Sequence, residues 1–223
     1  MDWIDDFNGT APLFPLPNVA LYPHVVQPLH MFEPRYRQMT ADAVAADGFL
    51  ALAVLRPGHD DTYNRKDAPI YPTACLGRIT GSRELPDGRW DVTVQGLSRV
   101  TVTRELPGEE LYRVGEMELR PDCLEEDSPE IRRVSGGVIE SFGRLYPQMA
   151  EHPMVEKMLR SDLPFAVLCD FIAHATEIET ETAARILCEP DVCSRGRILN
   201  GYLTAKLATK RAARPFPPAF SAN

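Results

Sequence analysis

Histidine and cysteine are the residue types in this chain best suited to metal binding or nucleophilic chemistry. The histidines lie at positions 24, 30, 59, 152 and 174, and the cysteines at positions 75, 123, 169, 188 and 193. No two histidines have the spacing of metal ligands, and the closest cysteines, Cys188 and Cys193, lack the two-residue spacing of a zinc knuckle. An odd number of widely spaced cysteines also disfavours a disulfide framework. We therefore expect buried, apolar thiols, with no metal and no cofactor.

Three local combinations of residues are candidates for other chemistry. His30 lies between two apolar residues, which favours a hydrogen-bonded histidine at the edge of the core over a proton-transfer group. Glu33 and Arg35, in the segment EPRYR, predict a structural ion pair rather than a ligand-binding one. Cys169 precedes an aspartate and lies near His174, but the apolar helix expected around it favours an inert thiol. We therefore predict no catalytic residue.

Five aromatic residues are the best candidates for a contact surface, because rings on a β-sheet can line a groove for an extended peptide. They are Tyr22, Phe32, Tyr36, Tyr71 and Trp90. Any one of them is more often part of a hydrophobic core than of a binding site. As a group, they are the predicted peptide-contact residues.

Composition excludes several classes of function. The chain has 24 basic and 32 acidic residues, a formal charge of −8, which disfavours a surface that follows nucleic-acid phosphates. No segment has the roughly 20 consecutive apolar residues of a membrane span. The first ten residues, MDWIDDFNGT, are acidic and lack the features of a signal peptide, so we expect a cytoplasmic location. A phosphate-binding G-x-x-x-x-G-K-[ST] loop is missing.

The segment from Pro12 to Arg37 combines apolar residues with six prolines. Proline cannot donate to a β-ladder or lie within a helix, so the segment predicts two or three short strands that end at the prolines or lie at a sheet edge. Glu33 to Ala46 has the pattern of a helix, and Phe49 to Arg56 that of a strand buried on both faces. A polar loop is expected between Pro57 and Pro72.

The clearest β pattern follows this loop. Four further strands are predicted, at 75–85, 89–95, 99–106 and 112–119. Asp87-Gly88 is typical of a tight hairpin turn. Trp90, Val92 and Val94 alternate with polar residues, so each strand should have one buried and one wetted face. Several short antiparallel strands indicate a small closed or half-closed barrel.

Helical spacing begins after a linker at 121–129. Helices are expected over about 131–145, after a cap at Asp162, over 180–188, and from Pro190 toward Arg211. The predicted fold class is therefore α+β. We divide the chain into a β-barrel subdomain (1–121), a helical bundle (122–214) and a loose proline-rich tail (215–223).

Several segments carry a family resemblance. PLFPLPNVALYP, followed by PLHMFEPRYR, resembles the start of the amino-terminal substrate-recognition domain of Lon proteases. LPDGRWDVTVQGLSRVTV is similar to the central hairpin of that family, and EPDVCSRGRILNGYL is similar to its last helix. The resemblance implies a PUA-like barrel followed by a helical bundle. It also implies the stand-alone bacterial form of this domain, because the chain has neither an ATPase loop nor a recognisable Ser/Lys protease motif.

The resemblance implies a non-enzymatic recognition or adaptor module. Such a module would bind exposed apolar or unfolded polypeptide, by adding a strand at a barrel edge or by packing aromatic rings. Its expected partners are polypeptide or protein clients, with a separate protease as a further candidate. Two alternatives stay open. PUA-like barrels elsewhere bind RNA, although the acidic charge disfavours this, and an enzyme with an unrecognised site could use the 57–72 loop as a lid.

Overall fold

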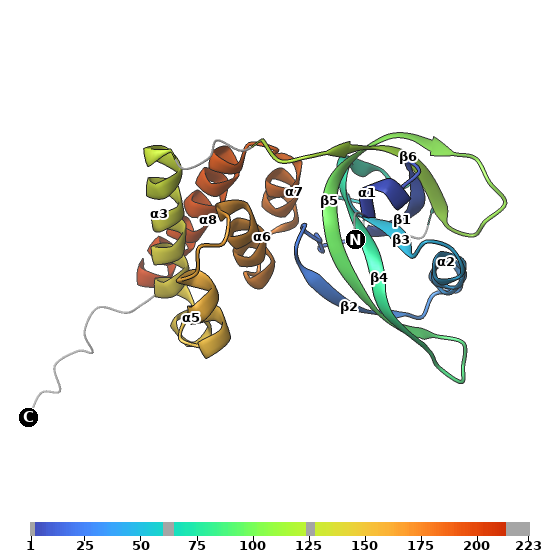
Figure 1. Ribbon diagram of the computed structural model, residues 1–223, viewed down its shortest axis with the longest axis horizontal. Helices are drawn as coiled ribbons and strands as arrows, with labels where there is room; N and C mark the ends of the chain where they lie inside the picture. Colours follow the sequence, from blue (N-terminus) through green and yellow to red (C-terminus); the bar gives the residue numbers. More distant parts are fainter. Residues whose placement is uncertain (1–2, 60–64, 124–127, 213–223) are drawn as a thin grey trace, which may run out of the picture.

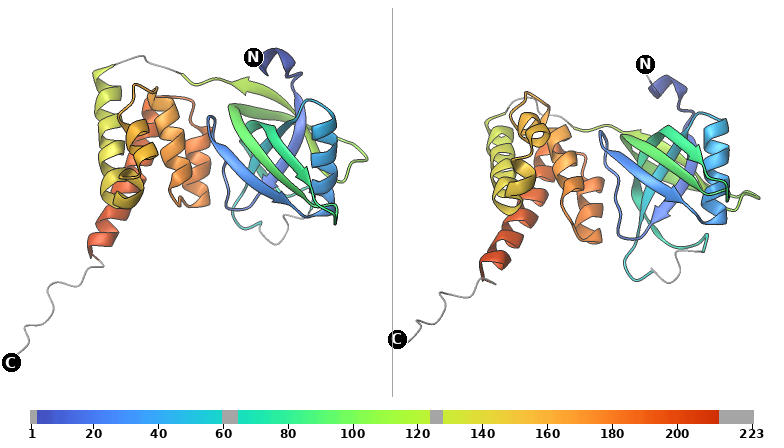
Figure 2. Two further views of the ribbon diagram at one scale, coloured as in Figure 1. Left: turned by 60° about the horizontal axis from the view of Figure 1, so that its bottom comes forward. Right: turned by 90° about the horizontal axis from the view of Figure 1, so that it is seen from below.

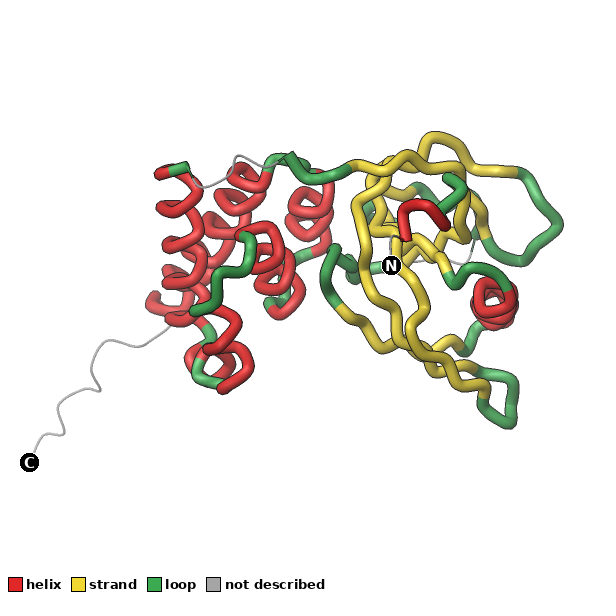
Figure 3. The backbone as a smooth tube through the Cα atoms, in the orientation of Figure 1, coloured by secondary structure: helices red, strands yellow, loops and turns green. Residues whose placement is uncertain are grey.

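The computed structural model describes residues 3–59, 65–123 and 128–212 and has two parts, a β-barrel and a group of helices (Figure 1). The strands gather at one end of the molecule and most helices at the other (Figure 3). Two further views confirm that the parts lie side by side, with the chain crossing once after the last strand (Figure 2). This arrangement confirms the predicted α+β class and the order of barrel before helices.

Six strands form one sheet, in the order β2-β5-β4-β3-β1-β6, with a further pairing between β5 and β6. Their bounds are β1 Thr10–Leu16, β2 Val26–Met31, β3 Phe49–Leu55, β4 Ile70–Glu84, β5 Trp90–Leu106 and β6 Arg113–Arg120. The β5–β6 pairing closes a ring of β1, β3, β4, β5 and β6. Within the described part of the chain, β2 pairs only with the first half of β5, and so lies at an edge beside this ring.

The strand β5 corrects one prediction, because the segments expected as two strands form a single one of 17 residues. The pairing of β5 with β4 shifts register between Leu76 and Gly77, opposite Ser98 and Gly96. A bulge at this point bends the strand without ending it. Gly96 is required here, because an added Cβ atom would lie 2.1 Å from the Tyr22 carbonyl oxygen.

Two hydrophobic clusters divide the core, and β3 contributes to both. Phe49, Ala51 and Ala53 belong to the smaller cluster. Leu50 and Leu52 face the opposite way and join the larger cluster, which continues into the helices. The strand is buried along its whole length, as its continuous apolar sequence predicted.

The helices are α1 Trp3–Asp6, α2 Pro34–Ala45, α3 Pro129–Leu145, α4 Pro147–Ala150, α5 Pro153–Leu159, α6 Phe165–Ala175, α7 Thr180–Cys188 and α8 Val192–Ala212. The predicted bounds of α7 are confirmed. Asp162 does not cap α6, because that helix begins only after Pro164. Asp191 instead caps α8 by accepting a hydrogen bond from the Ser194 N–H at 2.6 Å. No described helix is both long and apolar enough to cross a membrane.

A buried group of charges joins the barrel to the helices. Arg99 of β5 and Arg195 of α8 are at most 1% exposed, and both contact the fully buried Asp170 of α6. Asp122, just after β6, pairs with both arginines. Burial opposes the charge of Arg99, but Asp170 and Asp122 outweigh it and raise the pKa of that guanidinium.

The division into subdomains at 121/122 stays a prediction, and the tail at 215–223 lies outside the described residues.

Candidate functional site

The five predicted contact residues do not form one surface. Tyr22 and Tyr36 are buried, and their hydroxyl groups donate to the carbonyl oxygens of Ala183 and Pro15. Burial raises the pKa of Tyr22, which keeps its hydroxyl neutral. Neither ring can contact a peptide at the surface of this structure. A strand pattern identifies aromatic residues but not which of them the helices cover, so the sequence could not separate these two from the rest.

The other three aromatic residues are accessible to different degrees. Phe32 is 58% exposed just after β2, whereas Tyr71 and Trp90 are half-buried. Trp90 pairs with Met31, so it lies at the same end of the sheet as Phe32. Tyr71 lies near the start of β4, toward the opposite end, with its ring 5.3 Å from the Arg56 guanidinium. Trp90 alternates with the same period as the buried Val92 and Val94 and packs against the core, so Phe32 alone remains as an exposed candidate.

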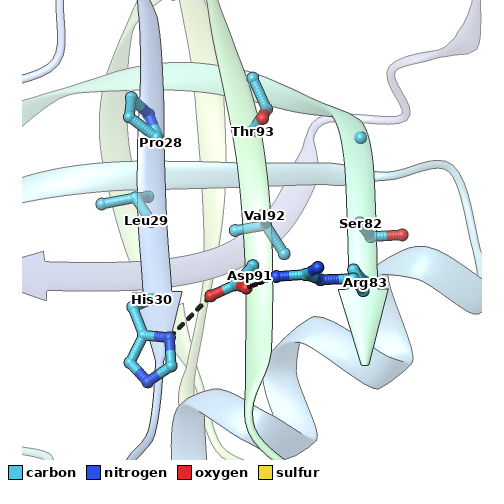
Figure 4. Close-up of a pocket in the computed structure, with 9 residues that line it drawn as sticks. Pro28, Leu29, His30, Ser82, Arg83, Asp91, Val92 and Thr93 are labelled. Carbon is cyan, nitrogen blue, oxygen red and sulfur yellow. Dashed lines mark hydrogen bonds and ion pairs between the residues drawn. The ribbon is translucent and has the colours of Figure 1, made fainter. Parts of the chain in front are cut away.

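A groove lies across β2, β5 and β4 on the same side as Phe32. We call it the β2 groove. Its volume is about 540 Å³, and its lining residues are Pro28, Leu29, His30, Gly81, Ser82, Arg83, Asp91, Val92 and Thr93. The pairing registers place His30, Asp91 and Arg83 in one row and Pro28, Thr93 and Gly81 in another row on the same face. Figure 4 shows the first row and, from the second, Pro28 and Thr93.

The charged row is internally paired. His30 Nδ1 lies 2.8 Å from Asp91 Oδ1, and an Arg83 Nη2–H donates to Asp91 Oδ2 at 2.6 Å. Arg89 Nη1 lies 3.3 Å from His30 Nε2, so Arg89 is the donor there and the Nδ1 proton faces Asp91. The hydrogen bonds from Arg83 and then His30 lower the pKa of Asp91. This carboxylate therefore stays ionised while it holds both neighbours in place.

A histidine oriented by a carboxylate is part of many catalytic sites, but a nucleophile must lie on its other side. The ring nitrogens of His30 instead face Asp91 and Arg89. Ser82 lies one register row away, and its hydroxyl points away from His30 (Figure 4). The arrangement supplies polar contacts rather than an activated hydroxyl group.

The alternative thiol nucleophile is also excluded by burial. Cys169 is fully buried in α6, and desolvation raises the pKa of its thiol to about 12. A thiol that is neutral at physiological pH and closed to solvent cannot attack a substrate.

No group of three or more potential metal ligands occurs among residues 3–59, 65–123 and 128–212. The predicted ion pair of Glu33 and Arg35 is confirmed, with a distance of 3.0 Å.

The free edge of β2 lies beside the groove. Just before β2, the Gly96 N–H donates to the Val25 carbonyl. Backbone groups alternate in direction along a strand, so those of Gln27 and Leu29 also face β5. The backbone groups of Val26, Pro28 and His30 therefore face outward, away from β5. Pro28 has no N–H, and its carbonyl oxygen accepts from the Gln27 side chain at 2.9 Å. This edge can therefore pair with another strand only on either side of Pro28.

Exposed apolar side chains follow this edge. Val26 is 52% exposed, Pro28 is exposed, and Phe32 is 58% exposed with its ring stacked near that of His30 at a centroid distance of 6.3 Å. These residues alternate along the chain on one face of β2. Sequence analysis missed Val26, Pro28, Arg83 and Asp91. The alternation around Asp91 indicated a wetted face but not the strand that lies beside it.

A comparison with known protein families settles the relationship. Residues 10–205 match the family model described as the ATP-dependent protease La (LON) substrate-binding domain. The chain belongs to this family. It is 26% identical over 203 residues to a Lon protease of Desulfatibacillum aliphaticivorans, covering 91% of this chain and 24% of that protein. A Lon protease of Dictyoglomus thermophilum is 24% identical over 209 residues, with 91% and 25% coverage. This member of the Lon substrate-binding domain family thus spans about a quarter of the length of these relatives.

Solved structures confirm the fold of this Lon-type domain. The N-terminal domain of Mycobacterium avium complex Lon protease superimposes with a TM-score of 0.70 at 16% identity, covering 87% of this chain and 98% of that one. The Lon N-terminal domain protein from Xanthomonas campestris gives a TM-score of 0.59 at 19% identity, with 92% and 99% coverage. The matches are to the substrate-binding domain, not to protease or ATPase modules.

Proposed function

We propose that this protein is a non-enzymatic recognition module that binds exposed apolar segments of unfolded polypeptide on the outer face of β2 and in the β2 groove. The exposed apolar row of Val26, Pro28 and Phe32 carries this proposal. Apolar side chains that alternate along an edge strand match the period of an extended peptide. The membership of the chain in a substrate-binding family supports the same function.

Side-chain contacts should dominate the binding. A client strand laid along β2 could form backbone hydrogen bonds only near Val26 and His30, because Pro28 interrupts the edge. The apolar row can instead bury apolar side chains of clients that differ in sequence. Each Å² of apolar surface removed from water contributes about 25 cal/mol of binding free energy. Such a surface gives broad recognition with modest affinity. Tyr71 lies outside this surface, and Trp90 packs against the core on the opposite face of the sheet.

The clients would be protein substrates, as the family name indicates, and transfer to a separate protease is part of the proposal. A cytoplasmic location stays a prediction. The net negative charge of the chain disfavours RNA as the ligand.

A titration with an unfolded polypeptide tests the proposal. The probe is a fluorescently labelled model protein, held unfolded by reduction and carboxymethylation, and its native form is the control. Fluorescence anisotropy should report binding of the unfolded form only. Phe32→Ser should weaken it by roughly tenfold to a hundredfold, since burial of a large apolar side chain is worth about 1.5–3 kcal/mol.

Met154→Ser is the matched control, because Met154 is 73% exposed on α5, away from β2. This variant should bind like the original protein. Equal loss of binding in both variants, or no binding of the unfolded probe at all, would contradict a site on β2.

A further inference from the structure

A second cavity lies where the barrel meets the helices, and it shares no lining residue with the β2 groove. We call it the junction pocket. Its volume is about 330 Å³, at the lower end of the range of small-molecule sites, roughly 300–1,000 Å³. Its apolar walls come from the segment before β2, from β5, from the segment after β6 and from the start of α6, and they include Pro23, Leu97, Pro121, Pro164 and Val167. The fixed φ of the prolines gives these walls a preset shape.

Arg120, the last residue of β6, also lines the junction pocket. It pairs with Arg99 across the β5–β6 ladder, so two guanidinium groups start from directly opposite positions. Like charges in such positions repel each other unless opposite charges balance them. Within the described part of the chain, no carboxylate forms an ion pair with Arg120, and its Nη1–H donates to the uncharged Thr73 Oγ1 at 3.3 Å.

The carboxylates nearby already have their own partners. Asp170 is fully buried and pairs with Arg99 and Arg195. Asp122, which lines the pocket, accepts a hydrogen bond from each of the same two arginines, at 3.1 Å and 3.2 Å. Two arginines and two aspartates therefore balance one another, and the charge of Arg120 is the one left over.

Two backbone features lie beside this charge. His24 is exposed, lines the pocket and has φ of +65°, a conformation that is uncommon outside glycine and that often accompanies ligand sites. Helix α6 begins after Pro164 without a side-chain cap, and Ala166 of its first turn lines the pocket. The positive end of this helix adds to the charge of Arg120.

We propose that the junction pocket binds a carboxylate that carries a small apolar group. The carboxylate contacts Arg120, whose planar guanidinium can donate two parallel hydrogen bonds to it, and His24. The apolar group lies against Pro121, Pro164 and Val167. Two sources share this chemistry, the C-terminal residue of a polypeptide and a free short-chain acid.

A phosphate fits this pocket less well. It would bring close to two negative charges to a site with one unbalanced positive charge, beside the carboxylate of Asp122. It would also leave the apolar walls in contact with water. A carboxylate with an apolar group matches both the charge and the walls.

Isothermal titration calorimetry on the full chain tests the site with two acids and the amide of each. The first acid is the peptide N-acetyl-Ala-Ala-Leu, and the second is 4-methylpentanoate, which has a similar branched apolar end without a peptide. At least one acid should bind, and its amide should bind roughly tenfold more weakly or worse, because the amide loses the charge that Arg120 recognises. Tighter binding of the peptide acid would identify a polypeptide C-terminus as the source, and tighter binding of 4-methylpentanoate a free acid.

Two variants locate the binding. Arg120→Gln should weaken the acid roughly tenfold and bring it to the level of its amide. Val167→Phe should block acid and amide alike by narrowing the pocket, and circular dichroism with urea unfolding checks that both variants fold. Arg104→Gln is the matched control, because Arg104 lies elsewhere on β5, 66% exposed and paired with Glu116, and it should leave the affinity unchanged.

The site goes beyond the proposed function, and each can fail without the other. Equal affinity for acid and amide, or no binding of either acid at millimolar concentration, would overturn the carboxylate site. An unchanged preference for the acid in a folded Arg120→Gln would do the same. None of these results bears on the binding of unfolded polypeptide to β2, which the anisotropy titration measures separately.

Discussion

Arg99 of the barrel and Asp170 of α6 form a two-point ion pair across the junction between the strands and the helices. Arg99 Nη2–H donates to Asp170 Oδ1 at 2.5 Å, and Nη1–H donates to Oδ2 at 3.2 Å. Both side chains are at most 1% exposed. A pair with this geometry fixes the orientation of the two parts, because displacement of either one would leave a buried charge unpaired. The surface of β2 is thereby held at a constant position relative to the helices.

Removal of one member of this pair should destabilise the protein severely. Asp170→Leu leaves Arg99 and Arg195 buried beside a single carboxylate, that of Asp122. We expect a loss of about 3–5 kcal/mol in the free energy of unfolding, measured by urea denaturation. The double variant Arg99→Met/Asp170→Leu should recover a large part of that loss. A single variant as stable as the original protein would show that the pair does not join the two parts.

The charged row in the β2 groove should behave in the opposite way. Asp91→Asn removes the partner of His30 and Arg83, but these side chains are exposed at 40%, 42% and 74%. Water screens such pairs, so the urea midpoint should stay where it is. Binding of the unfolded model protein should change, because Arg83 loses the carboxylate that positions it. A large drop in the urea midpoint would assign Asp91 a role in folding instead.

The stability of the protein should fall in mild acid because of His174. This side chain is half-buried beside the loop that joins β1 to β2, and burial lowers its pKa, although a hydrogen bond with the Ala20 backbone opposes the shift. The unfolded chain therefore binds a proton at a higher pH than the folded chain does. Stability should decrease as pH falls below about 6.5, the ordinary value for histidine.

His174→Gln tests this assignment, because glutamine does not titrate. Glu177 lines the same small cavity and is exposed, so it serves as the second position, in Glu177→Gln. Thermal unfolding between pH 7.5 and 5 should show a flatter pH dependence in His174→Gln and an unchanged one in Glu177→Gln. Parallel curves for the original protein and His174→Gln would refute the prediction.

Much of the fold could be predicted from local pattern, but the pairing of distant segments could not. The apolar run at 49–55 predicted a strand buried on both faces, and the helical spacing at 180–188 predicted α7. The short helices α4 and α5 were missed, because four and seven residues are too few for a helical period to stand out. Local pattern shows that a residue is buried or wetted, not which segment lies beside it.

The candidate site shows the same limit more strongly. His30 and Asp91 are 61 residues apart, and only the β2–β5 register brings them together. Phe32 and Tyr36 belong to one aromatic-rich segment, yet one is exposed while the other packs edge-on against Phe14. Helix α2 begins between them and turns the second ring into the core.

The edge of β2 yields the last prediction. Pro28 removes the one N–H donor at the centre of that edge, between Val26 and His30. Pro28→Val would restore the donor and give a continuous, partly apolar edge, which is the usual template for pairing between copies of a chain. We expect self-association of the variant at concentrations where the original protein keeps its own assembly state, measured by sedimentation velocity.

Pro86→Ala is the control for this prediction, because Pro86 lies in the exposed hairpin turn between β4 and β5 and not at the edge. It removes a proline at the surface without adding a donor to β2. Unchanged sedimentation of Pro28→Val would show that side chains, and not the missing donor, protect the edge. Self-association specific to Pro28→Val would instead explain why an exposed apolar strand carries a proline at its centre. The edge would then be closed to stable pairing, while its apolar face stays open to clients.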